Sequence, residues 1–305
     1  MTVLQALILG IVQGFTEFLP VSSSGHLVLV PEFFNVPAPA LGFDILLHLA
    51  TLVAVFGYFI RDIAKMAVAL VAPGRMERGK ARFWRRVLLW LVIGSIPAGI
   101  AGVVFAKFFE GLFTSTMSVG IFLMLTGCLL WGADVALRRM ERGRPAHDIV
   151  RKTWSEAGAG EDARSEAGEH GTTGRPAKGL GGMRAADALV IGCFQALAIA
   201  PGLSRSGATI SAGVYLGFDR QTAARFSFLL SIPAILGAAL VKIKDISGAF
   251  TGATGGAYAV GAVAALISGL IAVYFMMRYL RRHRLRLFAV YTLVLGAFVV
   301  ILSAV

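Results

Sequence analysis

A set of long, nearly uncharged apolar runs limits the fold of this sequence more than any other feature. Six of them have about the 20 residues that a helix needs to cross the hydrocarbon core of a bilayer. They cover approximately residues 43–60, 87–106, 117–137, 224–241, 258–277 and 287–304. Only 15% of the residues are charged, against about one quarter in an average soluble domain. The sequence therefore predicts an all-α integral membrane protein with six transmembrane helices.

Two further apolar stretches, 3–30 and 186–218, are interrupted in the middle by Pro, Gly and Ser. Such breaks predict helix–turn–helix hairpins. Non-helical backbone is tolerated inside a membrane only where protein or a water-filled cavity surrounds it. We therefore expect two re-entrant helical hairpins that enter the membrane and return. No Lys or Arg precedes Arg61, so we expect the first stretch to remain in the mature protein rather than to act as a signal peptide.

The basic residues gather in three of the connecting segments. Segments 61–86, 138–185 and 278–286 hold 23 of the 29 Lys and Arg residues. The positive-inside rule makes these segments cytoplasmic and leaves both termini outside. The net charge of +12 is then a consequence of topology, and we expect no nucleic-acid partner. The Gly-rich, mixed-charge composition of 138–185 indicates a disordered cytoplasmic loop.

The two broken stretches are related by an internal repeat. At an offset of 182 residues, five polar or glycine positions coincide. The matched pairs are Gly10 with Gly192, Gln13 with Gln195, Ser22 with Ser204, Ser24 with Ser206, and Gly25 with Gly207. Each repeat would hold one hairpin and three spans, namely 1–137 and 186–305, with 138–185 between them. Because three spans is an odd number, the second repeat must run inverted, and one site near the midplane would use both hairpins.

The first hairpin carries the sequence QGFTEFLPVSSSGH. Gln13 and Glu17 share one helix face, and Pro20 should end that helix. A serine triplet and a histidine follow: Ser22, Ser23, Ser24 and His26. Taken alone, the serines fit a structural role as helix N-caps as well as they fit a functional role. A carboxylate in a membrane segment is costly and usually marks function, so Glu17 is the stronger candidate.

The second hairpin carries PGLSRSGAT, a set that complements the first. Free N–H groups at a helix start, together with the guanidinium of Arg205, predict a site for an anion such as phosphate. Together the two hairpins supply the kinds of side chain that phosphoryl transfer needs, because that reaction depends on positioning and charge neutralisation. Because Glu17 offsets the charge of Arg205, a diphosphate would need a divalent cation, for which Glu17 is a candidate ligand.

These motifs closely resemble those of the undecaprenyl-diphosphatase (bacitracin-resistance) family of bacterial membrane phosphatases. The resemblance covers nearly the whole chain except 141–183, and rests on QGFTE, FLPVSSSGH, GCFQALAIAPG, PGLSRSGAT and FSFLL. It implies hydrolysis of undecaprenyl diphosphate to the monophosphate carrier lipid of cell-wall synthesis, bacitracin resistance, and assistance by Mg²⁺ or Ca²⁺. It also implies a bacterial plasma-membrane location and leaves a homodimer open.

Carried over by position, the resemblance implies a role for each catalytic candidate. Glu17 would be the essential acidic residue, Ser23 the nucleophile and Arg205 the diphosphate clamp. His26 would be the acid or base, or an alternative nucleophile. Where many members have a first glutamate this chain has Gln13, which cannot act as a base. The other motif positions are expected to contact the substrate: Gln13, Ser22, Ser24, Gln195, Gly202, Ser204, Ser206, Gly207 and Thr209.

Several alternatives stay open. A polyprenyl-phosphate transporter or flippase would also use inverted repeats with a charged central site. Asp44 and His48 share a helix face, as a structural pair or as part of a cavity lining. Arg225 and Asp134, near span ends, are explained by snorkelling. Both cysteines, Cys128 and Cys193, lie in apolar runs and are expected to be small core residues rather than disulfide or metal partners.

Overall fold

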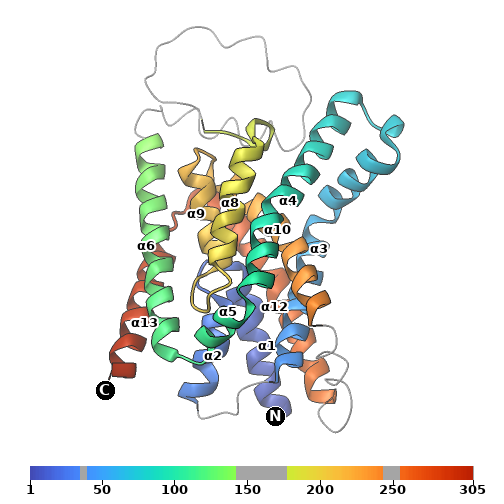
Figure 1. Cartoon of the computed structure of the whole chain (residues 1–305). Helices are drawn as coiled ribbons and strands as arrows, with labels where there is room; N and C mark the ends of the chain where they lie inside the picture. The colour runs from blue at the N-terminus through green and yellow to red at the C-terminus, as the bar shows by residue number, and fades with distance from the viewer. Residues whose placement is uncertain (35–39, 142–176, 243–254, 305) are drawn as a thin grey trace.

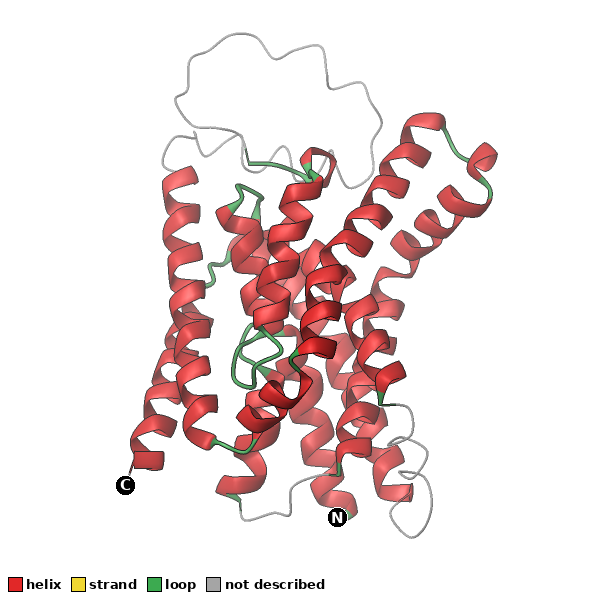
Figure 2. Ribbon diagram, viewed as in Figure 1, coloured by secondary structure: helices red, strands yellow, loops and turns green. Residues whose placement is uncertain are grey.

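The computed structural model describes residues 1–34, 40–141, 177–242 and 255–304, and within these ranges helices are joined by short loops, without strands (Figure 2). The helices are α1 (Val3–Phe18), α2 (Ser23–Phe33), α3 (Leu41–Val71), η1 (Pro73–Arg75), α4 (Arg78–Val104), α5 (Ala106–Phe113), α6 (Thr116–Glu141), η3 (Leu180–Gly182), α8 (Ala185–Leu197), α9 (Arg205–Tyr215), α10 (Arg220–Val241), α12 (Gly255–Arg282) and α13 (Arg286–Ala304). The prediction of an all-α chain is confirmed.

Six of these helices are long and apolar enough to cross a membrane: α3, α4, α6, α10, α12 and α13. They coincide with the six apolar runs, so the predicted number of spans is confirmed. The helices extend further than the apolar runs. Residues 61–86, predicted as a connection, are mostly the ends of α3 and α4 around a short turn at Pro73 and Gly74. Charged side chains at exposed helix ends do not break a helix, whereas Pro and Gly do.

The two interrupted stretches form helical hairpins, as predicted. In the first, Thr2 caps α1 in a capping box with Gln5, and the helix ends at Phe18, before Pro20. In the second, α8 and α9 are joined by a turn at about mid-height of the molecule (Figure 1). Figure 1 shows the open end of the α1–α2 hairpin at the end of the molecule where both termini lie, and the open end of the α8–α9 hairpin at the opposite end.

Glycine contacts hold each hairpin against a long helix from the other half of the chain. A Cβ atom on Gly10 of α1 would lie 2.2 Å from the carbonyl oxygen of Gly261 in α12. A Cβ atom on Gly192 of α8 would lie equally close, 2.2 Å, to the carbonyl oxygen of Gly94 in α4. Such close backbone approach requires small residues, as is usual between helices in membranes.

The interior of the molecule is built around α9 and α10. Every residue of α9 from Ser206 to Val214 is buried, in contact with α6, α8 and α10. From α10, Phe228 meets Phe18 of α1 edge to face, with ring centroids 5.6 Å apart. The end of the first helix and the start of α9 are therefore fixed against the same core.

Four residues have contacts or positions that the sequence interpretation did not anticipate. Arg225, explained there by snorkelling alone, is paired in the structure: its Nε and Nη2 atoms donate to Oδ2 of Asp62 at 3.0 and 2.6 Å. Asp134 is likewise paired, with Arg138 at 2.9 Å. Cys128 and Cys193 are exposed rather than in the core, because each lies on an outward face of its helix. The disordered loop predicted within 138–185 lies mostly in 142–176, outside the described residues.

Candidate active site

The turn of the first hairpin presents Ser23 at the start of α2. Ser22 is the N-cap, and its Oγ accepts a hydrogen bond from the backbone N–H of Gly25 at 3.2 Å. The backbone of Ser22 has φ 71° and ψ 97°, and no other described non-glycine residue has a positive φ. A non-glycine residue in this region costs of order 1–3 kcal/mol and often marks a functional turn.

Glu17, in the last turn of α1, is the centre of the candidate site. Its side chain is buried, with 3% of it exposed. Oε2 accepts hydrogen bonds from Ser23 Oγ at 2.6 Å and from Gln13 Nε2 at 3.0 Å. Oε1 accepts from the guanidinium of Arg205. A buried carboxylate needs such partners to remain ionised, and here they come from both hairpins.

Arg205 is the first residue of α9 and brings the second hairpin to the first. Its helix is capped by Ser204, whose Oγ accepts from the N–H of Gly207 at 3.0 Å. Ser206 Oγ donates to the carbonyl oxygen of Leu19 at 3.2 Å, which ties the two turns directly. The helix starts of α2 and α9 are thus held together around one ion pair.

The sequence interpretation underrated His48. This residue of α3 lies with Nε2 3.6 Å from Glu17 Oε2, and 32% of its side chain is exposed. Its Nδ1 donates to the carbonyl oxygen of Asp44 at 2.8 Å, which leaves Nε2 free to face the carboxylate. Of the two alternatives for Asp44 and His48, the structure favours the lining of the site. The sequence signal that could have identified His48 is the presence of a histidine within a transmembrane span, but no motif surrounds it.

His26 lies beside the cluster but does not bond to Ser23. Its Nδ1 is 2.7 Å from the carbonyl oxygen of Ser22, and its Nε2 is 2.7 Å from the hydroxyl of Tyr291 in α13. Because a carbonyl only accepts, Nδ1 carries the proton and Nε2 accepts from the phenol. The two rings are nearly parallel, 10° apart, with centroids separated by 5.8 Å. Tyr291 has no motif and was not predicted.

The other predicted contact residues make contacts within the hairpins and with neighbouring helices. A Cβ atom on Gly202, whose φ is +91°, would lie 2.3 Å from the carbonyl oxygen of Val119 in α6. Gly207 likewise faces α6, at Thr126. Thr209 Oγ1 is bonded to Ser227 Oγ at 2.6 Å. Two hydroxyls complete the set: Ser24 Oγ, 3.3 Å from Ser22 Oγ, and Ser204 Oγ, 3.2 Å from Ser206 Oγ.

Gln195, the repeat partner of Gln13, is buried in α8, and both polar atoms of its amide lack a hydrogen-bond partner among the described residues. It makes no recorded bond to the Glu17 cluster. The repeat therefore reproduces the residue but not its role as a neighbour of a carboxylate, because the position that matches Glu17 is Ile199.

The donor atoms around Glu17 suit an anion more than a resident metal ion. The described residues contain no group of three or more His, Cys, Asp or Glu side chains placed to hold a metal. Oxygen donors for a hard cation are present in Glu17 and in Oε1 of Gln13, which is buried and unpartnered. Such a pair fits a cation whose remaining ligands come from phosphate oxygens and water.

The start of each short helix also offers unused N–H donors. The backbone N–H groups of Ser23, Ser24, Arg205 and Ser206 have no backbone acceptor among the described residues. Helix starts carry partial positive charge and bind phosphate groups. Two such starts, one guanidinium and a serine hydroxyl bonded to a carboxylate are the parts needed to hold a diphosphate and attack it.

Comparison with known proteins agrees with this chemistry. The family model described as bacitracin resistance protein BacA matches residues 6–298. The chain belongs to the BacA family. Relatives named undecaprenyl-diphosphatase include those of Moorella thermoacetica, 39% identical over 98% of this chain and 97% of the relative, and Pelotomaculum thermopropionicum, 37% identical over 100% and 98%. A third, from Methanosphaera stadtmanae, is 36% identical over 99% of both chains.

Proposed function

We propose that this BacA-family protein hydrolyses undecaprenyl diphosphate to undecaprenyl phosphate and inorganic phosphate, within the bacterial plasma membrane. The observation that carries the proposal is the bonding of Glu17 to both Ser23 and Arg205, which joins a base, a hydroxyl and a cation from two hairpins. The named activity of full-length relatives points to the same lipid substrate. Recycling this carrier would support peptidoglycan synthesis and resistance to bacitracin.

The hydrogen bond from Ser23 Oγ to Glu17 Oε2, at 2.6 Å, supports a two-step route. Ser23 Oγ attacks the terminal phosphorus while Glu17 takes its proton, and the bond from that phosphorus to the bridging oxygen breaks. Glu17 then returns the proton to the leaving undecaprenyl phosphate. In the second step Glu17 accepts a proton from water and the water oxygen attacks the phosphoserine. The bond from phosphorus to Ser23 Oγ breaks, and Glu17 passes its proton to Ser23 Oγ, which restores the hydroxyl and the carboxylate. Acid–base assistance of this kind contributes about 10²–10⁴ in rate.

Arg205 would neutralise the charge that develops on the phosphoryl oxygens, and arginine suits phosphate because its donors form a fork. In the structure this guanidinium is bonded to Glu17. The substrate would therefore compete with the carboxylate for Arg205, and this competition would free Glu17 as Ser23 gives up its proton. His26 would act by holding the Ser22 carbonyl, and through it the turn that carries Ser23.

A divalent cation, Mg²⁺ or Ca²⁺, is part of the proposal. Glu17 and Oε1 of Gln13 would hold it, together with oxygens of the diphosphate. Such an ion would neutralise phosphate charge that a single arginine, already offset by Glu17, leaves uncompensated. Since Gln13 brings no second negative charge, we expect metal affinity to depend strongly on bound substrate.

The inverted repeat belongs to the same proposal, with 1–137 and 186–305 as its two halves. Two sets of matched contacts support it: the Ser22 and Ser204 caps on Gly25 and Gly207, and the packing of α1 on α12 and of α8 on α4. The hairpins would enter the membrane from opposite faces. The basic ends of α3, α4, α6 and α12 would face the cytoplasm, with both termini outside.

The test is release of phosphate from undecaprenyl diphosphate by the purified protein in detergent micelles, with Mg²⁺, with Ca²⁺, and with a chelator. Micelles offer no second side, so a lipid transporter or flippase releases no phosphate. We expect metal-dependent release. Absence of release from well-folded protein under every metal condition would overturn the phosphatase proposal and favour transport of a polyprenyl phosphate.

A further inference from the structure

The basic end of the molecule has a cavity that the proposed reaction does not use. It measures about 190 Å³ and lies between α4 and η3. Its lining is Gly79, Arg82, Phe83, Arg86, Val87 and Trp90 from α4, with Leu180 and Gly181 from η3. A second cavity of about 260 Å³ adjoins it and shares Arg82. Neither cavity is lined by a residue of the Glu17 cluster.

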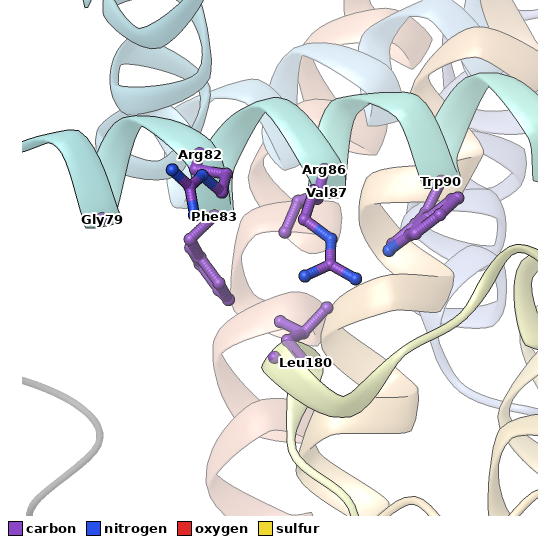
Figure 3. A pocket seen from close by; sticks show the side chains of 8 residues that line it. Gly79, Arg82, Phe83, Arg86, Val87, Trp90 and Leu180 are labelled. Atoms are coloured by element: carbon purple, nitrogen blue, oxygen red, sulfur yellow. The ribbon is translucent and has the colours of Figure 1, made fainter.

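The α4 residues of the first cavity form one continuous face of the helix. Arg82, Arg86 and Trp90 follow at intervals of four, so they lie in a row along α4. Figure 3 shows the Arg86 side chain extending from α4 toward Leu180, beside the ring of Trp90. The row passes from charged to aromatic as α4 runs into its apolar part.

The two arginines are free to bind a ligand. Arg82 and Arg86 are exposed, and within the described part of the chain neither takes part in a hydrogen bond or ion pair. The neighbouring Arg85 differs, because its Nε donates to the carbonyl oxygen of Ala69 at 2.6 Å. Two guanidinium groups one helical turn apart are well placed to share one phosphate group.

The apolar part of the wall selects a lipid over a soluble anion. Phe83, Val87, Trp90 and Leu180 give the cavity a non-polar side. Beyond Trp90, the apolar segment of α4 is the least buried by other helices among the six candidate spans. Only 17% of its residues are buried inside the protein, against 50% for α10. Tryptophan is enriched where lipid headgroups meet acyl chains. Polarity along α4 therefore changes in the same order as along a phospholipid, from phosphate to glycerol to acyl chain.

We propose that this cavity binds the headgroup of an anionic phospholipid, with Arg82 and Arg86 on the phosphate and Trp90 beside the start of the acyl chains. Basic cavities at the cytoplasmic ends of membrane helices are suited to such headgroups. The site is separate from the hydrolytic one. It would anchor the junction of α4 and η3, and hence the start of the second hairpin, to the membrane surface.

The test is a titration of the purified protein with phosphatidylglycerol, counting bound lipids by native mass spectrometry. The double variant Arg82→Ala, Arg86→Ala is compared with Arg281→Ala, Arg282→Ala, which removes the same charge from an exposed site at the end of α12. We expect affinity to fall about 30-fold in the first variant, from about 1 kcal/mol per lost guanidinium–phosphate hydrogen bond, and to stay unchanged in the second. The single variant Arg86→Gln, which disturbs packing less, should lose about fivefold in affinity.

Equal losses in both double variants would overturn the proposal, because binding would then reflect general surface charge. Displacement of the lipid by a large excess of inorganic phosphate would also overturn it, since the site would then recognise a soluble anion. The proposal would also be overturned if the protein bound phosphatidylcholine as tightly as phosphatidylglycerol. Both double variants should keep wild-type phosphate release in phosphatidylcholine nanodiscs, which shows that they are folded.

Discussion

Glu17→Gln separates the role of Glu17 as a base from its role in holding the site together. The substitution keeps the size of the side chain and an oxygen that can accept from Ser23 and Arg205. It removes the negative charge and with it the ability to take the proton of Ser23 Oγ, 2.6 Å away. Arg205 also loses its counter-charge and becomes available to the substrate.

The expected result is a fall in kcat without a rise in KM. Loss of the base should lower kcat by about 10²–10⁴, equivalent to about 3–5 kcal/mol in the barrier. At saturating Mg²⁺, which offsets the loss of one metal ligand, the KM for undecaprenyl diphosphate should stay equal or decrease, because a guanidinium no longer shared with Glu17 binds phosphate more strongly. The assay is steady-state phosphate release in micelles at saturating Mg²⁺, with the folded fraction measured by size-exclusion chromatography.

A matched control exists at the far end of the molecule. Glu141 is also partly buried and paired with an arginine, with Oε1 3.1 Å from Arg220 Nη2, yet it lies outside the site. Glu141→Gln should leave kcat and KM unchanged. The reasoning is refuted if Glu17→Gln raises KM while kcat stays within tenfold of wild type, because Glu17 would then be needed for binding and not for proton transfer.

Two further predictions concern the scaffold and the histidine. Gly192→Ala should destabilise the protein by about 1–3 kcal/mol, because its Cβ would lie 2.2 Å from the carbonyl oxygen of Gly94. Gly99→Ala, whose Cβ would enter open space, should not destabilise it. Equal melting midpoints of the two variants in detergent would contradict this prediction. Tyr291→Phe removes the 2.7 Å hydrogen bond to His26 Nε2 and should lower kcat no more than about fivefold, the equivalent of one hydrogen bond. A loss of a hundredfold or more would mean that the imidazole transfers a proton in the reaction.

Much of the fold could be predicted because membrane insertion imposes long apolar segments. Length and hydropathy alone located all six candidate spans, and Pro20 correctly marked the end of α1. Helix ends were less predictable. An apolar run ends at the membrane surface, whereas the backbone hydrogen bonds of a helix continue beyond it. For this reason α3 extends to Val71.

The pairing of Glu17 with Arg205 illustrates what the repeat could predict. Two hairpins that share one site would bring their turns together, and the structure bonds these two residues to each other although they are 188 positions apart. His48 and Tyr291 could not be found this way, because each reaches the site from a long helix whose rotation depends on packing. The pairing of Arg225 with Asp62 was missed for the same reason.

The most direct test of the two-hairpin site is a single-turnover measurement of phosphate release with Ser23→Ala and Arg205→Ala. Ser95→Ala in α4 and Arg138→Ala in α6 serve as controls, because each removes the same group from a bonded position elsewhere. The account predicts that both site variants lose release by 10²-fold or more while both controls keep the wild-type rate. Wild-type release by folded Ser23→Ala or Arg205→Ala protein would contradict it.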